Sequence, residues 1–254
     1  MIFRRDTGGQ RDLYGVDADG AGLTPVAIAT ENENFDSLTL DGLAIFNRDN
    51  DIFIVNTDGT GELPLGDASA FETFAGFTAD GAVIFSRRAE APGALDDLYL
   101  INTDGGGELA LATSADEERF AAATASGRII FTRTVGGQGD LHSVNADGGD
   151  PVTLADTPDD ELVADIGPEG QVIFVRLVGG QADLYAINAD GSGPTSTLAN
   201  TVHYENPQKL TFNARLIFTR DIAGQTDLFS IRLDGADERV LANSPDVEFS
   251  PEVR

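Results

Sequence analysis

Asp183-Leu184-Tyr185-Ala186-Ile187-Asn188-Ala189-Asp190-Gly191 reads as a short β-strand that runs into a tight turn. Leu184, Ala186 and Asn188 point to one face of the expected strand and Tyr185 and Ile187 to the other, because side chains alternate along a strand. Asp190-Gly191 supplies the positive φ that a two-residue hairpin turn requires. The same phrase occurs six times, at 12–20, 51–59, 97–105, 140–148, 183–191 and 227–235.

A second phrase, Ile-Phe followed by an arginine, precedes each copy of the first. Its isoleucines are Ile2, Ile45, Ile84, Ile130, Ile173 and Ile217, separated by steps of 43, 39, 46, 43 and 44 residues. A period near forty residues with short strands and glycine turns is typical of a propeller blade. We therefore predict an all-β, six-bladed β-propeller of four-stranded blades that fills residues 1–254 as a single domain.

Each repeat divides into four expected strands. Residues 74–78 form the first strand of one blade and 82–87 its second, whereas 51–56 and 62–65 form the third and fourth of the blade before. The second strand, such as 172–175, is almost continuously apolar, which suits a strand covered on both faces. Residues 249–254 align with the first strand and its turn at 77–82. We expect this C-terminal strand to complete the N-terminal blade and close the ring without an open edge.

The phrase Asp-Leu-Tyr-x-Ile-Asn-x-Asp-Gly, together with Ser250-Pro251-Glu252, resembles the TolB-type propeller repeat. That family carries a Ser-Pro-Asp-Gly turn before the apolar strand, and this turn is altered here, for example to Ala79-Asp80-Gly81. The resemblance covers the whole chain and implies the propeller fold. It also implies a scaffold for protein contacts, fused in different proteins to different domains, and a periplasmic or extracellular location.

The charge balance restricts the partners. The chain has 43 acidic against 16 basic residues, a net charge of −27, which repels nucleic acid and anionic lipid. There is no cysteine, no apolar run long enough to insert into a membrane, and no signal-peptide layout at residues 1–5. We expect a monomer with a protein partner. The acidic surface is either simply solvated or attracts cations or a basic partner.

Arginine and aspartate recur on either side of the loop between the second and third strands, as in the pair Arg176 and Asp183. A cross-strand ion pair explains this constancy. An arginine cluster for carboxylates or phosphates is the alternative. Six equivalent pairs favour the structural interpretation, because an active site normally breaks symmetry.

Five repeats carry a glutamate at the start of the first strand, where propeller blades approach the central channel: Glu33, Glu72, Glu118, Glu161 and Glu205. One interpretation is that each carboxylate accepts hydrogen bonds from backbone N–H groups within its own blade. The other is an acidic ring. Oxygen ligands favour Ca²⁺ or Mg²⁺, so Glu72, Glu118, Glu161 and Glu205 are the candidate ligands of an axial cation.

Catalytic motifs are sparse. His142 replaces tyrosine in the repeat phrase and is expected to pack, whereas His203 beside Tyr204 in a loop between blades is a better binding candidate. The Gly-Gly-Gln loops, as at 179–181, are read as turns, since no helix follows them to bind phosphate. We predict a non-enzymatic binding scaffold. It would use the channel mouth and the face that carries the irregular loops 89–96, 114–119 and 201–205. The alternative is a metal-dependent hydrolase or lactonase with an axial cation.

Overall fold

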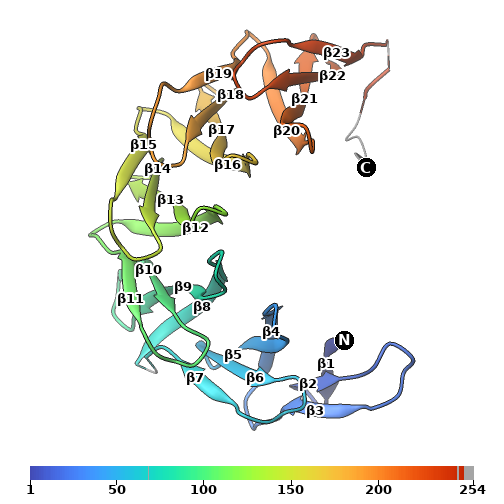
Figure 1. Ribbon diagram of the computed structural model, residues 1–254, viewed down its shortest axis with the longest axis vertical. Coiled ribbons are helices and arrows are strands. Elements are labelled where there is room, and N and C mark those ends of the chain that lie inside the picture. Colours follow the sequence, from blue (N-terminus) through green and yellow to red (C-terminus); the bar gives the residue numbers. More distant parts are fainter. Residues whose placement is uncertain (68, 245, 249–254) are drawn as a thin grey trace. The chain divides into compact units, whose positions relative to one another are not determined.

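The computed structural model describes residues 1–67, 69–244 and 246–248 (Figure 1). Within these ranges the protein contains strands and no helix, so no helix could span a membrane. The strands form five four-stranded antiparallel sheets and one three-stranded sheet. The chain divides into two compact units, residues 1–120 with 146–148 and residues 121–145 with 149–254. The predicted all-β architecture of six repeated sheets is confirmed.

The first unit contains the sheets of the first three repeats. Their strands are β1 (Ile2–Thr7), β2 (Gln10–Gly15) and β3 (Thr24–Ala27); β4 (Glu33–Leu38), β5 (Leu43–Arg48), β6 (Asp51–Asn56) and β7 (Leu63–Leu65); and β8 (Ala70–Phe77), β9 (Val83–Ala89), β10 (Asp97–Ile101) and β11 (Leu109–Ala112). In each sheet the strands pair in chain order, so every repeat is an antiparallel meander.

The second unit contains the next three sheets, and the boundary between the units falls within β12. Their strands are β12 (Glu117–Ala123), β13 (Arg128–Val135), β14 (Gln138–Asn145) and β15 (Val152–Ala155); β16 (Asp160–Ile166), β17 (Gln171–Val178), β18 (Gln181–Asn188) and β19 (Ser196–Ala199); and β20 (Tyr204–Leu210), β21 (Arg215–Ile222), β22 (Gln225–Arg232) and β23 (Arg239–Ala242). The chain-order pairing is the same here.

The Asp-Gly phrase makes a different turn from the one predicted. Of Asp190 and Gly191 only the glycine has a positive φ, of 71°, and its N–H donates to the Asn188 carbonyl at 2.8 Å, while seven residues separate β18 from β19. In five of the six sheets the two-residue hairpin is instead the loop between the second and third strands, where both residues have positive φ, as at Gly179 (59°) and Gly180 (87°). The Gly-Gly-Gln segments are thus turns, as predicted, and they set the register of the central hairpin.

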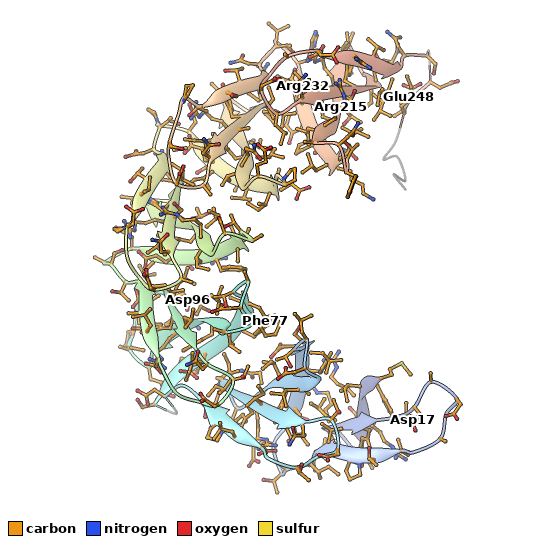
Figure 2. The ribbon with its side chains drawn as sticks, in the orientation of Figure 1. Asp17, Phe77, Asp96, Arg215, Arg232 and Glu248 are labelled. Atoms are coloured by element: carbon orange, nitrogen blue, oxygen red, sulfur yellow. The ribbon has the colours of Figure 1, made fainter. Side chains whose placement is uncertain are left out.

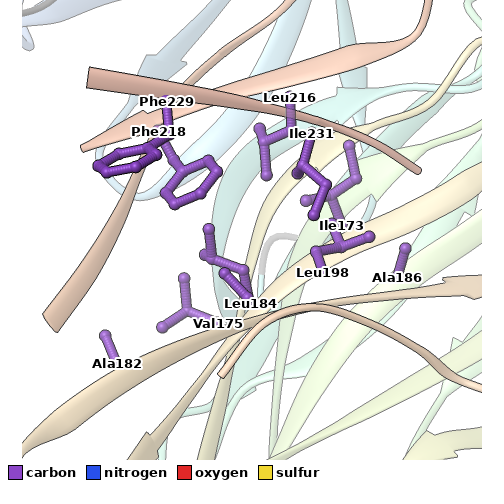
Figure 3. Close-up of a cluster of buried hydrophobic side chains, with 11 residues drawn as sticks. Ile173, Val175, Ala182, Leu184, Ala186, Leu198, Leu216, Phe218, Phe229 and Ile231 are labelled. Atoms are coloured by element: carbon purple, nitrogen blue, oxygen red, sulfur yellow. The ribbon is translucent and has the colours of Figure 1, made fainter. Parts of the chain in front are cut away.

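In the five four-stranded sheets the second strand is buried on both faces over its central residues, as its sequence indicated, whereas β1 of the three-stranded sheet is half-buried or exposed. Val172, Ile173, Phe174 and Val175 of β17 are all buried. Between the last two sheets of the second unit, aliphatic side chains from β17, β18 and β19 pack against Leu216, Phe218, Phe229 and Ile231 of β21 and β22 (Figure 3). Burial of such side chains stabilises each by about 1.5–3 kcal/mol, so contacts between neighbouring sheets supply much of the stability.

Paired aromatic rings mark the centre of each sheet. Phe174 stacks on Tyr185 across β17 and β18 with ring centroids 5.5 Å apart and an interplanar angle of 22°. His142 takes the place of the tyrosine and stacks on Phe131 with the same separation and angle. The prediction that His142 packs within its sheet is confirmed.

The first sheet has three strands among the described residues, whereas the others have four. Its missing first strand is the one that the sequence assigned to residues 249–254, which lie outside the described residues. Closure of the ring by that strand, and the single domain that it would complete, therefore stay predictions.

Candidate binding site

The arginines of the second strands pair with the glutamates of the first strands. Arg176 and Asp183 lie opposite each other in the β17–β18 register, as expected, but Arg176 Nε donates to Glu161 Oε1 on the other side at 2.8 Å. Arg220 likewise donates to Glu205 at 2.9 Å, and Arg48 and Arg87 bind Glu33 and Glu72. The predicted arginine–aspartate ion pair is wrong in its partner, because the second strand is central and has a neighbour on each side.

The predicted glutamates are buried inside the sheets. Glu33, Glu118, Glu161 and Glu205 are 0% exposed and Glu72 is 1% exposed. A hydroxyl from the preceding loop adds a second donor in several repeats, as where Thr157 Oγ1 donates to Glu161 Oε1 at 2.5 Å. The carboxylates thus accept hydrogen bonds mainly from arginine and hydroxyl side chains, whereas the structural interpretation expected backbone N–H donors; Glu72 also accepts one from the Asp67 N–H.

Two opposing effects act on the pKa of Glu72, one of these buried glutamates. Burial raises the pKa of the Glu72 carboxyl, while hydrogen bonds from the Asp67 N–H and from Arg87 act in the opposite direction. Arg87 also forms a two-point ion pair with Glu108. The described residues bring no three His, Asp or Glu side chains together in a group that could hold a metal ion. The axial cation stays a prediction, and each of its candidate ligands accepts a hydrogen bond from an arginine or a hydroxyl group.

The irregular loops are partly brought together. In the first unit, the Glu118 N–H donates to the Asp96 carbonyl at 2.8 Å, which places the loop at 114–119 against the end of the insertion at 89–96. In the second unit, the His203 N–H donates to Thr201 Oγ1 at 3.1 Å and the half-buried His203 precedes Tyr204, which is 47% exposed. These residues lie at the end of the sheets where the two-residue hairpins also lie.

The larger cavity of the second unit lies at the opposite end of the strands. Its volume is about 640 Å³, and it lies between the sheets β16–β19 and β20–β23, where β18 and β22 run into their Asp-Gly turns. The wall combines aliphatic groups with amides and charges, and includes Ile187, Asn188, Pro194, Arg215, Arg232 and Leu233. We call it the turn-end cavity. Its volume is within the range of small-ligand sites, about 300–1,000 Å³.

Arg215 and Arg232, the two arginines of the turn-end cavity (Figure 2), differ in exposure and in the number of groups that they bind. Arg215 is 15% exposed and is held by several hydrogen bonds: it donates to Asp237 Oδ2 at 2.9 Å, to the Asp237 carbonyl and to both oxygens of Ser230. Arg232 is 59% exposed and pairs with the exposed Asp234 at 3.2 Å. An exposed pair of this kind is worth about 0–1 kcal/mol. Arg215 therefore shapes the wall, and Arg232 is available to a ligand.

The cavity is lined by residues at which the last repeat departs from the others. Arg232 stands where the other repeats have Asp17 or an asparagine, and Leu233 stands where they have alanine or threonine. Arg215, Ser230 and Asp237 recur as a set only in the fourth repeat, as Arg128, Ser143 and Asp150. The sequence comparison of repeats could have found these departures, which our reading of the shared phrases missed.

A second cavity of about 300 Å³ lies at the same end of the strands, between the sheets β12–β15 and β16–β19 of the second unit. Ser126, Arg128 and Gln171 line it. Arg128 is 5% exposed and its guanidinium is held by Asn145, Asp150 and Ser143, so it has the same wall-forming role as Arg215.

Comparison with known proteins bears on the fold. No protein-family model and no curated protein matches the chain. A structure of a putative TolB from Agrobacterium tumefaciens matches with a TM-score of 0.53 at 14% identity, over 89% of this chain and 86% of that one. The propeller domain of the Trilobed protease from Pyrococcus furiosus matches with a TM-score of 0.56 at 13% identity, over 99% of this chain and 80% of that one.

A longer protein gives a higher score. Porphyromonas gingivalis dipeptidyl peptidase 4 matches with a TM-score of 0.75 at 13% identity, over 96% of this chain and 42% of that one. At identities this low the likeness shows the fold and leaves function to be argued from the site. Six repeated antiparallel sheets, together with these matches, show that the chain has a β-propeller fold like that of the TolB structure.

Proposed function

We propose that the protein is a non-enzymatic binding scaffold that holds a segment of a partner protein in the turn-end cavity. The observation that carries this proposal is the coincidence of the cavity with the departures of the last repeat, Arg232 and Leu233. A repeat with a purely architectural role can keep the residues of the shared phrase, whereas the last repeat has replaced two of them where it lines the cavity. TolB-like neighbours support a scaffold of this kind.

The wall chemistry suits an extended peptide with a carboxylate. Arg232 presents an exposed guanidinium, and its weak pair with Asp234 can be exchanged for a two-point contact with a ligand carboxylate. Pro168, Pro194 and Leu233 provide an aliphatic surface beside it. Asparagine amides, such as that of Asn213, can bind peptide N–H and C=O groups. A side-chain or C-terminal carboxylate next to an aliphatic residue is the proposed recognition element.

The loop end of the sheets and the channel mouth remain the rival contact surface. It is formed by the loops at 89–96, 114–119 and 201–205, with His203 and Tyr204. The alternative of a metal-dependent hydrolase or lactonase needs a set of metal ligands, and the described ranges place no three candidate ligands together. We favour the turn end over the loop end, because the departures of the last repeat line the turn-end cavity.

Arg232→Asn tests the proposed function. This change introduces the residue that four other repeats carry at the same position, so the fold should be kept. The partner, captured from an extract of the source with the wild-type protein and identified, is titrated against each variant. Loss of a charge-assisted hydrogen bond of about 1.5–3 kcal/mol predicts affinity weaker by about 10-fold to 150-fold.

Arg119→Asn is the matched control, because Arg119 is 69% exposed in the loop-end region and its removal changes the charge equally. It should bind as the wild type does. Unchanged affinity of Arg232→Asn, with weaker binding by Arg119→Asn, would assign the contact to the loop end instead.

A further inference from the structure

The buried glutamates leave one carboxylate oxygen without a donor. In the last sheet, Arg220 and Thr201 both donate to Glu205 Oε1, whereas Glu205 Oε2 is buried and accepts no hydrogen bond. Oε2 of Glu33, Glu72 and Glu161 is likewise buried and accepts no hydrogen bond. Buried polar atoms nearly always have a partner, so a repeated exception requires an explanation.

The aspartate of the preceding repeat lies near several of the buried glutamates. The Glu72 N–H donates to the Asn50 carbonyl at 2.6 Å, next to Asp51, and the charge of Asp51 acts on the Glu72 carboxyl. The Glu248 N–H likewise donates to the Thr226 carbonyl at 3.0 Å, next to Asp227. These contacts join the third strand of one sheet to the start of the next and place a glutamate close to an aspartate of the preceding repeat.

The junction between β18 and β20 shows the consequence most clearly. Asp183 is 5% exposed and Glu205 is 0% exposed, and the two carboxyl groups interact directly with each other. Asp183 Oδ1, like Glu205 Oε2, is buried without a donor. Two ionised carboxylates in this position would repel each other and leave both oxygens unsatisfied. One shared proton supplies the missing donor to the pair.

The neighbouring charges do not remove the repulsion. Arg176 lies opposite Asp183 in the register, but its Nε is engaged by Glu161. Arg220 is engaged by Glu205 Oε1 and by Glu238. Burial, followed by the negative charge of Glu205, raises the pKa of the Asp183 carboxyl, and Arg176 acts in the opposite direction.

We propose that Asp183 keeps a proton at neutral pH and donates its O–H to Glu205 Oε2, so that a bound proton joins two adjacent sheets of the second unit. Glu205 Oε2 is the acceptor, because Arg220 and Thr201 already donate to Glu205 Oε1. The proton site is a structural element of the sheet junction and is independent of the partner site in the turn-end cavity.

The proton on Asp183 makes the stability of the folded protein decrease as the pH rises. An unfolded aspartate titrates near pH 3.9, so the unfolded chain releases the proton that the folded protein holds. The stabilisation is fully present below that value and is lost as the pH rises toward the folded pKa. At one proton per molecule, Tm should fall by roughly 3–5 °C per pH unit over this range.

Asp183→Asn tests the proposal, because its amide N–H₂ replaces the O–H donor and cannot titrate. The variant should have a Tm at pH 8 equal to or above that of the wild type, and should lack the one-proton slope between pH 5 and pH 8. Asp156→Asn, a change of an exposed aspartate with the same loss of charge, should keep the wild-type slope. A reduced Tm at pH 8 with an unchanged slope would overturn the proposal.

The carboxyl ¹³C resonance of Asp183 in the wild-type protein provides a measurement that needs no variant of the junction. With the resonance assigned by its absence from the Asp183→Asn spectrum or through its backbone, it should have the shift of a protonated acid at pH 7. The shift of a carboxylate at pH 7 would overturn the proposal even if Asp183→Asn failed to fold.

Discussion

Arg220→Met should destabilise the second unit strongly, because Arg220 compensates a buried charge. Its Nε donates to Glu205 at 2.9 Å, its Nη atoms bind Glu238 at 3.0 and 2.9 Å, and its side chain is 9% exposed. Methionine keeps the apolar stem over Phe229, whose ring centroid lies 4.6 Å from the Arg220 Cζ. The variant thus removes the charge with little change in packing.

The magnitude follows from the burial of the two partners. An uncompensated buried carboxylate costs about 3–5 kcal/mol, and loss of the partly exposed Glu238 contact adds up to about 1 kcal/mol. We expect the free energy of unfolding to fall by about 4 kcal/mol at pH 7. For a chain of this size that corresponds to a decrease in Tm of roughly 8–16 °C.

Urea unfolding followed by circular dichroism measures the effect, with Arg220→Met/Glu205→Gln as the second arm. Removing both charges should restore at least half of the loss, because no unpaired charge stays buried. Arg119→Met, which breaks an exposed pair with Glu117, should cost less than about 0.5 kcal/mol. A loss below about 1 kcal/mol for Arg220→Met, or no recovery in the double variant, would refute the reasoning.

Three further predictions concern the fold. Gly235→Ala should cost about 2 kcal/mol or more in unfolding free energy, since its Cβ would lie 2.4 Å from the Thr197 carbonyl in the neighbouring sheet. Gly180→Ala, with open space around it, should cost only about 1 kcal/mol for its positive φ. Equal costs by urea titration would contradict the close approach of Gly235 to Thr197. Leu184→Ala, at a fully buried position, should cost about 2–5 kcal/mol, and Leu162→Ala, 49% exposed, less than about 0.5 kcal/mol; similar losses in calorimetry would argue against the assigned core. Deletion of residues 247–254 should lower Tm well beyond the effect of an eight-residue tail, because it would open a sheet edge, and a truncated chain that melts with the full-length protein would exclude the predicted closure.

Much of the fold could be predicted from the repeat phrases, because strand alternation and glycine positions are local properties. The turn type was harder to predict. Asp190-Gly191 satisfies the composition of a two-residue hairpin, but it lies in a seven-residue segment before β19, and Asp190 does not adopt a positive φ. The hairpin that determines the register is at Gly179-Gly180, where both residues adopt it.

The ion pairs show why a central strand is ambiguous. Arg176 has a carboxylate in register on each side, Asp183 on β18 and Glu161 on β16, and proximity in sequence favoured the aspartate. The better signal was present: the glutamate precedes the arginine by 15 residues in five repeats, whereas the distance from arginine to aspartate varies. A constant separation indicates a pair that the fold maintains.

The candidate site could not be found from the shared phrases, because residues that all repeats share indicate the common fold and not the features of one repeat. The turn-end cavity depends on Arg232 and Leu233, which differ from the phrase, and on two sheets whose contact is a tertiary property. The departures could be seen in the sequence, but the cavity between the sheets could not.

Hydrogen–deuterium exchange of the protein with and without its partner tests the central claim most directly. If the turn-end cavity holds the partner, binding should slow exchange at 188–196 and 232–237, and leave the loops at 89–96 and 201–205 unchanged. Protection of those loops, with no change around Arg232, would contradict the account.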